Sequence, residues 1–253
     1  MNFVDLDTAL TATGLRALVA ASVPSPWSQA ALAIFHLKKL PVVTARTRTV
    51  DPTFKCWGGA KNLPAILMDD EPVRTGWAEI LALAERLTPD PPLIPDDPKE
   101  RIRVMGLCHE IMSEGALLWS ARLLGIDAGM STDGREGFPK WAAAHLAPRY
   151  GWKKVSIKTA HQRAIEALML LDTELNHTPG HYYSNDVVTA LDLYSAAAIN
   201  ALVPLTESDC PIEPPFRAAF AWIGSMLGDA ITPALIAHRN LVVTRFFKLP
   251  IEL

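Results

Sequence analysis

The sequence has few of the residues that build disulfide, zinc or membrane-spanning proteins. Its three cysteines, Cys56, Cys108 and Cys210, are odd in number and far apart, so they predict no disulfide framework. No C-x-x-C pair is present, which excludes thioredoxin-type dithiol chemistry and finger-type structural zinc. No apolar run approaches the roughly 18 residues that a membrane span requires. We therefore expect no membrane association.

An excess of charge of one sign is also missing. The formal net charge is -3, from 24 Lys and Arg against 27 Asp and Glu, and it favours neither nucleic acid nor an anionic membrane surface. Residues 1–7 are acidic where a signal peptide would be basic, so we expect a cytoplasmic protein. With 49% hydrophobic and 20% charged residues, the 253-residue chain should bury a substantial core.

Two partial metal motifs fail on inspection. His109 and Glu110 resemble the start of a zincin helix, but position 113 holds serine instead of the second histidine. His177, His181 and Asp186 share a predicted loop without a ligand spacing, so we interpret them as solvated side chains. The sequence predicts no metal site.

The first strong structural signal lies in residues 15–28. Residues 15–21 form an apolar run interrupted only by Arg16, which predicts a buried strand. Pro26 suits the first position of a helix and Ser25 suits its N-cap, so the strand delivers a hydroxyl to the positive end of a helix. That position favours an anion, although serine is also a good cap with no further role.

The remaining patterns predict a mixed α/β part followed by an all-helical part. Residues 1–13 are expected to be an irregular lead-in, and the proline- and aspartate-rich residues 88–97 a linker. We place the domains at residues 1–90 and 98–253, joined by 91–97. Before the linker, the predicted strands cover 42–47, 65–68 and 73–74, a loop covers 48–63 and a helix covers 78–87. After the linker, we predict a long helix with an inner stripe from Ile102 to Trp119 and a glycine-bearing loop over 125–137. Further helices are predicted over 140–146, 160–175, 187–202, 216–227 and 233–247.

Four segments, in this order and at these separations, resemble those of the glutathione S-transferases. Residues 25–28 resemble the Ser-Pro-aromatic turn of the serine-type members, and residues 62–67 resemble the Val-Pro-x-Leu segment, whose proline is cis. Residues 77–81 resemble the start of the helix after the acid-Ser pair, and residues 182–192 resemble a Tyr-x-x-Gly-Asp segment of the helical domain. The chain thus resembles a bacterial-like, serine-type glutathione S-transferase.

The resemblance implies a thioredoxin-like N-terminal domain, an all-α C-terminal domain, a homodimer, and glutathione as co-substrate without a metal. The implied function is transfer of the glutathione thiolate to a small hydrophobic electrophile, with Ser25 donating a hydrogen bond to the sulfur. Lowering a thiol pKa by about two units requires about 2.7 kcal/mol, which a hydrogen bond to a charged group and a helix N-terminus together can supply. The alternative is a non-catalytic relative that binds an apolar ligand or a protein partner between its domains.

Two residues depart from the family pattern. Counting from Leu63, the acid-Ser pair that holds the γ-glutamyl group falls on Thr75 and Gly76, and neither supplies a carboxylate. The resemblance assigns glutathione binding to Ser25, Trp27, Leu63, Pro64, Thr75 and Gly76. The candidates for binding the glycyl carboxylate, which could also be plain surface charges, are Arg48, Lys55 and Lys61. The candidates for lining the electrophile pocket, which could also be core residues, are Trp27, Met105, His109 and Met112.

Overall fold

The sheet consists of β1 (Leu15–Ala20), β2 (Val43–Thr47) and β3 (Ala65–Met68) in the order β2-β1-β3. The central β1 is parallel to β2 and antiparallel to β3, and all its residues are buried. The computed structural model describes residues 3–21, 23–48, 55–154 and 156–251, so Ser22 and residues 49–54 of the predicted loop lie outside the described part. The three strand predictions are confirmed, whereas the strand predicted at 73–74 is reduced to a single bridge between Ile66 and Arg74.

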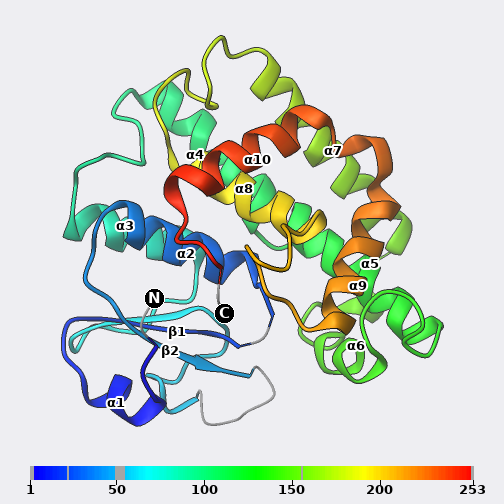
Figure 1. The fold of residues 1–253 in the computed structure, drawn as a ribbon, viewed down its shortest axis with the longest axis horizontal. Helices are drawn as coiled ribbons and strands as arrows, with labels where there is room; N and C mark the ends of the chain where they lie inside the picture. The colour runs from blue at the N-terminus through cyan, green and yellow to red at the C-terminus, as the bar shows by residue number, and fades with distance from the viewer. Residues whose placement is uncertain (1–2, 22, 49–54, 155, 252–253) are drawn as a thin grey trace.

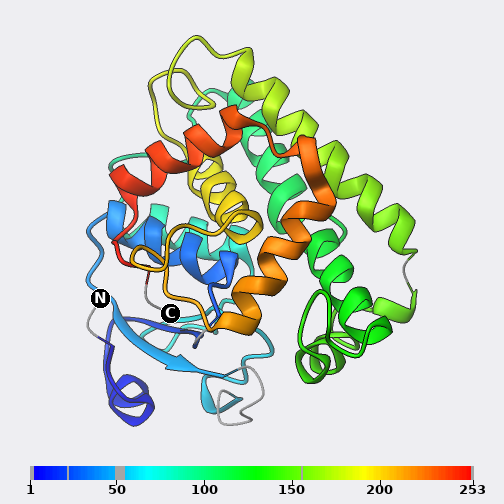
Figure 2. The same cartoon turned by 45° about the vertical axis from the view of Figure 1, so that its right-hand side comes forward.

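Figures 1 and 2 show the sheet toward one end of the molecule, with α1 below it and α2 between it and most of the other helices. Alternate residues of β1 serve two cores: Ala17 and Val19 join the large core under α2, and Leu18 joins a small core on the other face. The helices are α1 (Leu6–Thr11), α2 (Pro26–Leu37), α3 (Trp77–Leu87), α4 (Pro98–Met112), α5 (Leu117–Ser131), α6 (Lys140–Leu146), α7 (Ile157–Asn176), α8 (Ala190–Leu202), α9 (Pro214–Leu227) and α10 (Pro233–Phe246).

This arrangement is a thioredoxin-like N-terminal domain followed by an all-helical domain, as the sequence predicts. Asp97 caps α4 through the N–H groups of Lys99 and Glu100, which explains why the helical part starts at Pro98. The division at residues 91–97 stays a prediction. None of the helices in the described ranges is both long enough and apolar enough to cross a bilayer.

Helix α8 is buried along its whole length and forms the centre of the helical domain. A capping box of Thr189 and Asp192 starts it, with the Thr189 N–H donating to the Asp192 carboxylate at 2.8 Å. The Asp192 carboxylate also accepts a hydrogen bond of 3.1 Å from the Tyr183 N–H and lies 2.9 Å from His238 Nε2. Since every part of this carboxylate is buried, these partners are needed to offset its lost hydration.

Three predictions about the secondary structure are wrong. Residues 6–11 of the supposed irregular lead-in form α1, because Asp5 caps it and accepts the Thr8 N–H at 2.8 Å. The supposed helix stripe from Ile102 to Trp119 is interrupted after Met112, since Gly115 has a φ of +77° in the turn before α5, and Ile102 is 74% exposed.

The predicted loop over 125–137 is also wrong in its first half, since α5 continues to Ser131, and only residues 132–137 are turns and bends. Its two glycines serve close packing instead of a turn. A Cβ on Gly125 would lie 2.7 Å from the Phe138 ring, and one on Gly129 would lie 2.2 Å from the Phe138 carbonyl oxygen. The glycines therefore let the chain around Phe138 lie directly on α5.

Candidate functional site

Ser25 lies at the junction of β1 and α2, where the sequence predicts an N-cap, and this prediction is confirmed. Its Oγ accepts the Ser28 N–H at 3.5 Å, which is long for a cap bond. Among the described residues, no acceptor takes the hydroxyl hydrogen of Ser25. That hydrogen is free to be donated to a ligand at the helix N-terminus.

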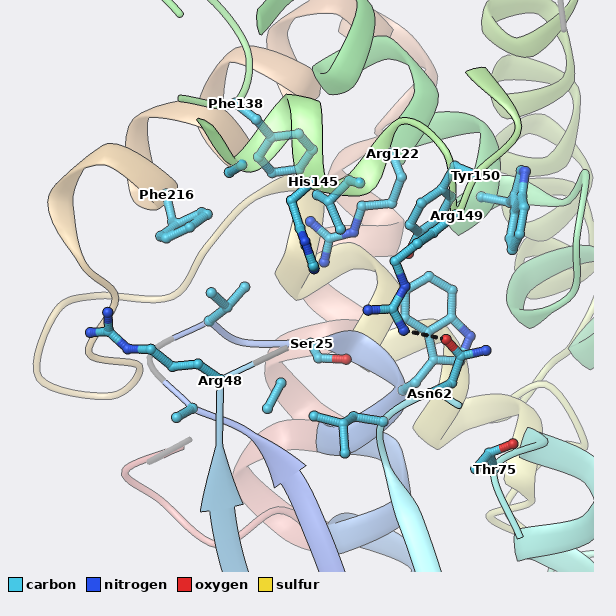
Figure 3. A pocket seen from close by; sticks show the side chains of 18 of the residues that line it. Ser25, Arg48, Asn62, Thr75, Arg122, Phe138, His145, Arg149, Tyr150 and Phe216 are labelled. Carbon is cyan, nitrogen blue, oxygen red and sulfur yellow. Dashed lines mark hydrogen bonds between the residues drawn. The ribbon is translucent and has the colours of Figure 1, made fainter. Parts of the chain in front are cut away.

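Ser25 lines a cavity of about 470 Å³ between the sheet end of the molecule and the helical domain. Figure 3 shows Ser25 on the sheet side, with Arg122 and His145 on the helical side. The N-terminal half contributes Ala20, Ala21, Val23, Ser25, Trp27, Arg48, Asn62, Leu63, Thr75, Gly76 and Trp77; the helical half contributes Met112, Ser113, Glu114, Trp119, Arg122, Phe138, Trp141, Ala142, His145, Leu146, Arg149, Tyr150, Glu213 and Phe216.

Leu63 brings backbone groups to this cavity. The Leu63–Pro64 peptide bond is cis, as the resemblance predicts. Within the described ranges, neither the N–H nor the C=O of Leu63 has a hydrogen-bond partner, so both are available to an extended ligand. Pro64 is buried beneath this edge and lines a smaller neighbouring hollow.

Thr75 and Gly76 line the same cavity at the start of α3. Gly76 is the N-cap and provides no side chain, so the first N–H groups of α3 are not capped by a side chain. Glu79, the acidic residue in the first turn of α3, is exposed and does not line the cavity. The site therefore presents two helix N-termini, of α2 and α3, and at Thr75 and Gly76 no cavity-lining residue carries a carboxylate.

Two tryptophans fix the approach of α4 to this region. The Trp27 indole N–H donates to the Met112 carbonyl at 2.9 Å, and the Trp77 indole N–H donates to the Ser113 hydroxyl at 3.0 Å. Trp27 and Met112 both line the cavity, whereas Met105 and His109, the other two residues expected in an electrophile pocket, do not. The reason is that α4 ends at Met112 and buries the face that carries Val104, Leu107, Cys108 and Ile111.

Among the three candidate cations, the structure brings one to the cavity. Arg48 lines it and forms an ion pair of 3.4 Å with Glu213. Lys55 and Lys61 are exposed and do not line it. No group of three or more metal-ligating side chains occurs in the described part of the chain.

The side of the cavity that the helical domain lines, here called the helical wall, was missed by sequence reasoning. Arg122 of α5 is 7% exposed, and its guanidinium lies 5.3 Å from the Phe138 ring centroid and 4.8 Å from that of Phe220. Burial lowers its pKa, and the nearby phenol oxygen of Tyr150 opposes this shift. One signal could have revealed it, since Arg122 is the sole charged residue between positions 115 and 126.

The fold that carries this cavity is that of the glutathione S-transferases. The β-etherase LigF from Sphingobium sp. strain SYK-6 is similar with a TM-score of 0.64 and 16% identity, over 92% of this chain and 96% of that one. A glutathione S-transferase from Methylobacillus flagellatus KT with glutathione bound is similar with a TM-score of 0.57 and 16% identity, over 91% and 95%. A maleyl pyruvate isomerase, a bacterial zeta-class glutathione S-transferase, has a TM-score of 0.51 and 17% identity, over 85% and 95%.

No protein-family model matches the sequence, and no curated protein is significantly similar to it. The identities to the solved structures are low, so the likeness establishes the fold. The chemistry has to be argued from the cavity itself.

Proposed function

We propose that the chain is a glutathione-dependent enzyme that activates the thiol through Ser25. The observation that carries this proposal is the hydroxyl of Ser25, which faces the cavity at the N-terminus of α2 with its hydrogen free for donation. A hydrogen bond to a charged sulfur contributes roughly 1.5–3 kcal/mol, and a helix N-terminus about 0.3–1 kcal/mol. Their sum of about 1.8–4 kcal/mol spans the roughly 2.7 kcal/mol needed for a two-unit shift of the thiol pKa.

The rest of the tripeptide has matching groups in the same cavity. The free N–H and C=O of Leu63 suit the cysteinyl backbone, which would extend the sheet edge at β3. The uncapped start of α3 at Gly76 suits the γ-glutamyl carboxylate. Arg48 is the candidate for the glycyl carboxylate because it alone of the three predicted cations lines the cavity.

The reaction class depends on the electrophile that the thiolate attacks. The similar structures include an etherase and an isomerase as well as glutathione S-transferases, and all three chemistries can begin with a glutathione thiolate. We favour transfer to a carbon electrophile held against the aromatic helical wall. A homodimer in the cytoplasm remains a prediction from the sequence, to be checked by light scattering and fractionation.

A second function, ligand binding without catalysis, is favoured by Thr75 and Gly76. Neither residue carries a charge that could form an ion pair with the γ-glutamyl ammonium. The affinity for glutathione should therefore be lower than it would be with a carboxylate at this position. A protein of this kind would use the cavity for an apolar ligand or a protein partner.

Calorimetric titration with glutathione, combined with ultraviolet absorbance of the bound thiolate, tests the proposal. The active enzyme should bind glutathione and show thiolate at neutral pH, and Ser25→Ala should keep most of the binding and lose the thiolate signal. S-methylglutathione, which has no thiol, is the matched control ligand. Absence of binding by both tripeptides would favour the second function.

A further inference from the structure

Arg122 is a buried cation whose surroundings do not neutralise it. It enters the cavity from α5, within an otherwise uncharged stretch, and is 7% exposed. Arginine stays protonated in proteins, so this side chain carries its charge into an aromatic setting. Its contacts are the rings of Phe138 and Phe220 and the phenol of Tyr150.

In the described ranges, no Asp or Glu forms an ion pair with Arg122. Two carboxylates line the same cavity, but Glu213 pairs with Arg48, and Glu114 forms no ion pair with Arg122. The other strongly buried arginines have backbone partners: Arg16 donates to the Asp69 carbonyl, and Arg239 donates to the Val203 carbonyl. Among the residues that the structure describes, Arg122 has neither an acidic partner nor a backbone carbonyl partner.

A buried charge of this kind is costly, and aromatic faces offset only part of the cost. Its position is more readily explained if a ligand supplies the missing anion. The surrounding wall specifies the rest of that ligand, because five aromatic side chains line this part of the cavity and favour a flat ring. These side chains are Trp119, Phe138, Trp141, Tyr150 and Phe216.

We propose that the second substrate is an aromatic carboxylic acid whose carboxylate pairs with Arg122. This inference rests on the proposed function for the thiolate half of the reaction. Arg122 lies on the helical side and Ser25 on the sheet side, so a bound acid would extend from the helical wall toward the sulfur (Figure 3). The planar guanidinium can hold a carboxylate by two parallel hydrogen bonds.

A carboxylate of glutathione is the other possible source of the anion, and the experiment separates the two. The probes are 2-naphthoate and its neutral amide, 2-naphthamide, titrated in the absence of glutathione with tryptophan fluorescence as the signal. Glutathione is titrated separately. The proteins are wild type, Arg122→Met, Arg122→Lys and, as a matched change of charge outside the cavity, Arg135→Met, whose guanidinium donates to the Thr132 carbonyl on the surface.

Wild type and Arg135→Met should bind the acid at least tenfold more tightly than the amide. Arg122→Met should lose at least tenfold in acid affinity, keep its amide and glutathione affinities, and melt at the same or a higher temperature, because an unpaired buried charge is removed. Arg122→Lys should retain part of the preference for the acid over the amide.

Equal affinity of wild type for acid and amide would overturn the proposal without any variant. Weakened glutathione binding with unchanged acid binding in Arg122→Met would assign the arginine to the tripeptide and also overturn it. Failure of glutathione to bind wild type, with acid binding intact, would instead reject the proposed transferase function alone.

Discussion

Arg149 of the helical domain donates a hydrogen bond of 2.6 Å to the side-chain oxygen of Asn62, the residue before Leu63 (Figure 3). The same guanidinium donates to the Lys61 carbonyl at 2.9 Å. Both Arg149 and Asn62 line the cavity. The helical domain thus holds in place the segment that offers its backbone to the tripeptide.

Removing this hydrogen bond should weaken glutathione binding indirectly, because the segment that carries Leu63 would no longer be held in place. Arg149→Met and Asn62→Ala should each raise the dissociation constant of glutathione about threefold to tenfold, since a partly exposed charge-assisted bond contributes about 0.5–1.5 kcal/mol. A double-mutant cycle measures the coupling. Additive effects would show that the two side chains act independently.

Ser25→Ala should lower turnover of a model electrophile at least tenfold, because the thiolate loses its hydrogen-bond donor. Stability should fall by less than about 1 kcal/mol, since the cap bond to the Ser28 N–H is long at 3.5 Å. Turnover and thermal unfolding check the two halves of the prediction. Unchanged turnover would leave Ser25 as a cap.

Ser28→Ala is the matched control on the same helix. The Ser28 hydroxyl is buried and has no hydrogen-bond partner in the described structure, so its removal should not lower stability. A large loss of turnover in this variant would shift the thiolate role from Ser25 to Ser28.

Gly76→Ser should stabilise α3 by a few tenths of a kcal/mol. The N-cap would gain a hydroxyl, and Glu79 lies at the position that completes a capping box. The new Cβ would lie 3.2 Å from the Glu79 carboxylate oxygen, which is the mobile end of an exposed side chain and can give way. Thermal unfolding of the single variant measures the gain.

Thr75→Glu combined with Gly76→Ser should tighten glutathione binding. The new carboxylate can pair with the γ-glutamyl ammonium, which contributes about 1.5–3 kcal/mol when shielded and about 0–1 kcal/mol when wet. The expected gain in affinity is therefore about 10- to 150-fold in a closed site. Tight binding by wild type with no gain would show that another residue already pairs with the ammonium.

Glu100 should make stability depend on acid pH. Hydrogen bonds from Arg103 lower the pKa of Glu100 from 4.5 to about 2. Since the pKa is lower in the folded state, this stabilisation is fully present above about pH 4.5 and is lost as pH falls toward 2. The partly exposed pair should contribute about 1–2 kcal/mol after screening by water.

Glu100→Gln tests this dependence. The variant should be less stable than wild type at pH 7, and the difference should vanish near pH 2, because protonation removes the same charge from wild type. Denaturant unfolding at a series of pH values gives the curve. Glu136→Gln is the control, since that exposed side chain forms no hydrogen bond or ion pair in the described part of the chain. A difference that does not change with pH would contradict the assignment.

The sequence predicted elements whose signals are local. Ser25 and Pro26 mark the start of α2, and Asp97 and Pro98 mark the start of α4, because capping depends on neighbours within one turn. Gly125 was misinterpreted, because its reason for being glycine is a ring that comes from elsewhere in the chain. Local patterns do not encode that contact.

The same distinction applies to the cavity. Ser25, Leu63, Thr75 and Gly76 lie on its sheet side, where short motifs carry the resemblance. The helical wall depends on how α5 and α6 pack, and the resemblance does not extend to its side chains. The expected Met105 and His109 do not reach the cavity, because α4 buries the face that carries Val104, Leu107 and Ile111 instead.

The helix that carries Ser25 also determines how the whole chain should unfold. Gln29 of α2 accepts a buried hydrogen bond of 2.8 Å from Asn200 of α8, and at the other end of α2 the Lys38 ammonium holds Glu85 at 2.7 Å and the Pro91 carbonyl at 2.8 Å. A single apolar core contains residues of β1, α2 and α8. The two domains should therefore unfold together, and calorimetry should show one transition. A helical domain taken from a homologue would fold against this N-terminal domain only if its surface matched α2.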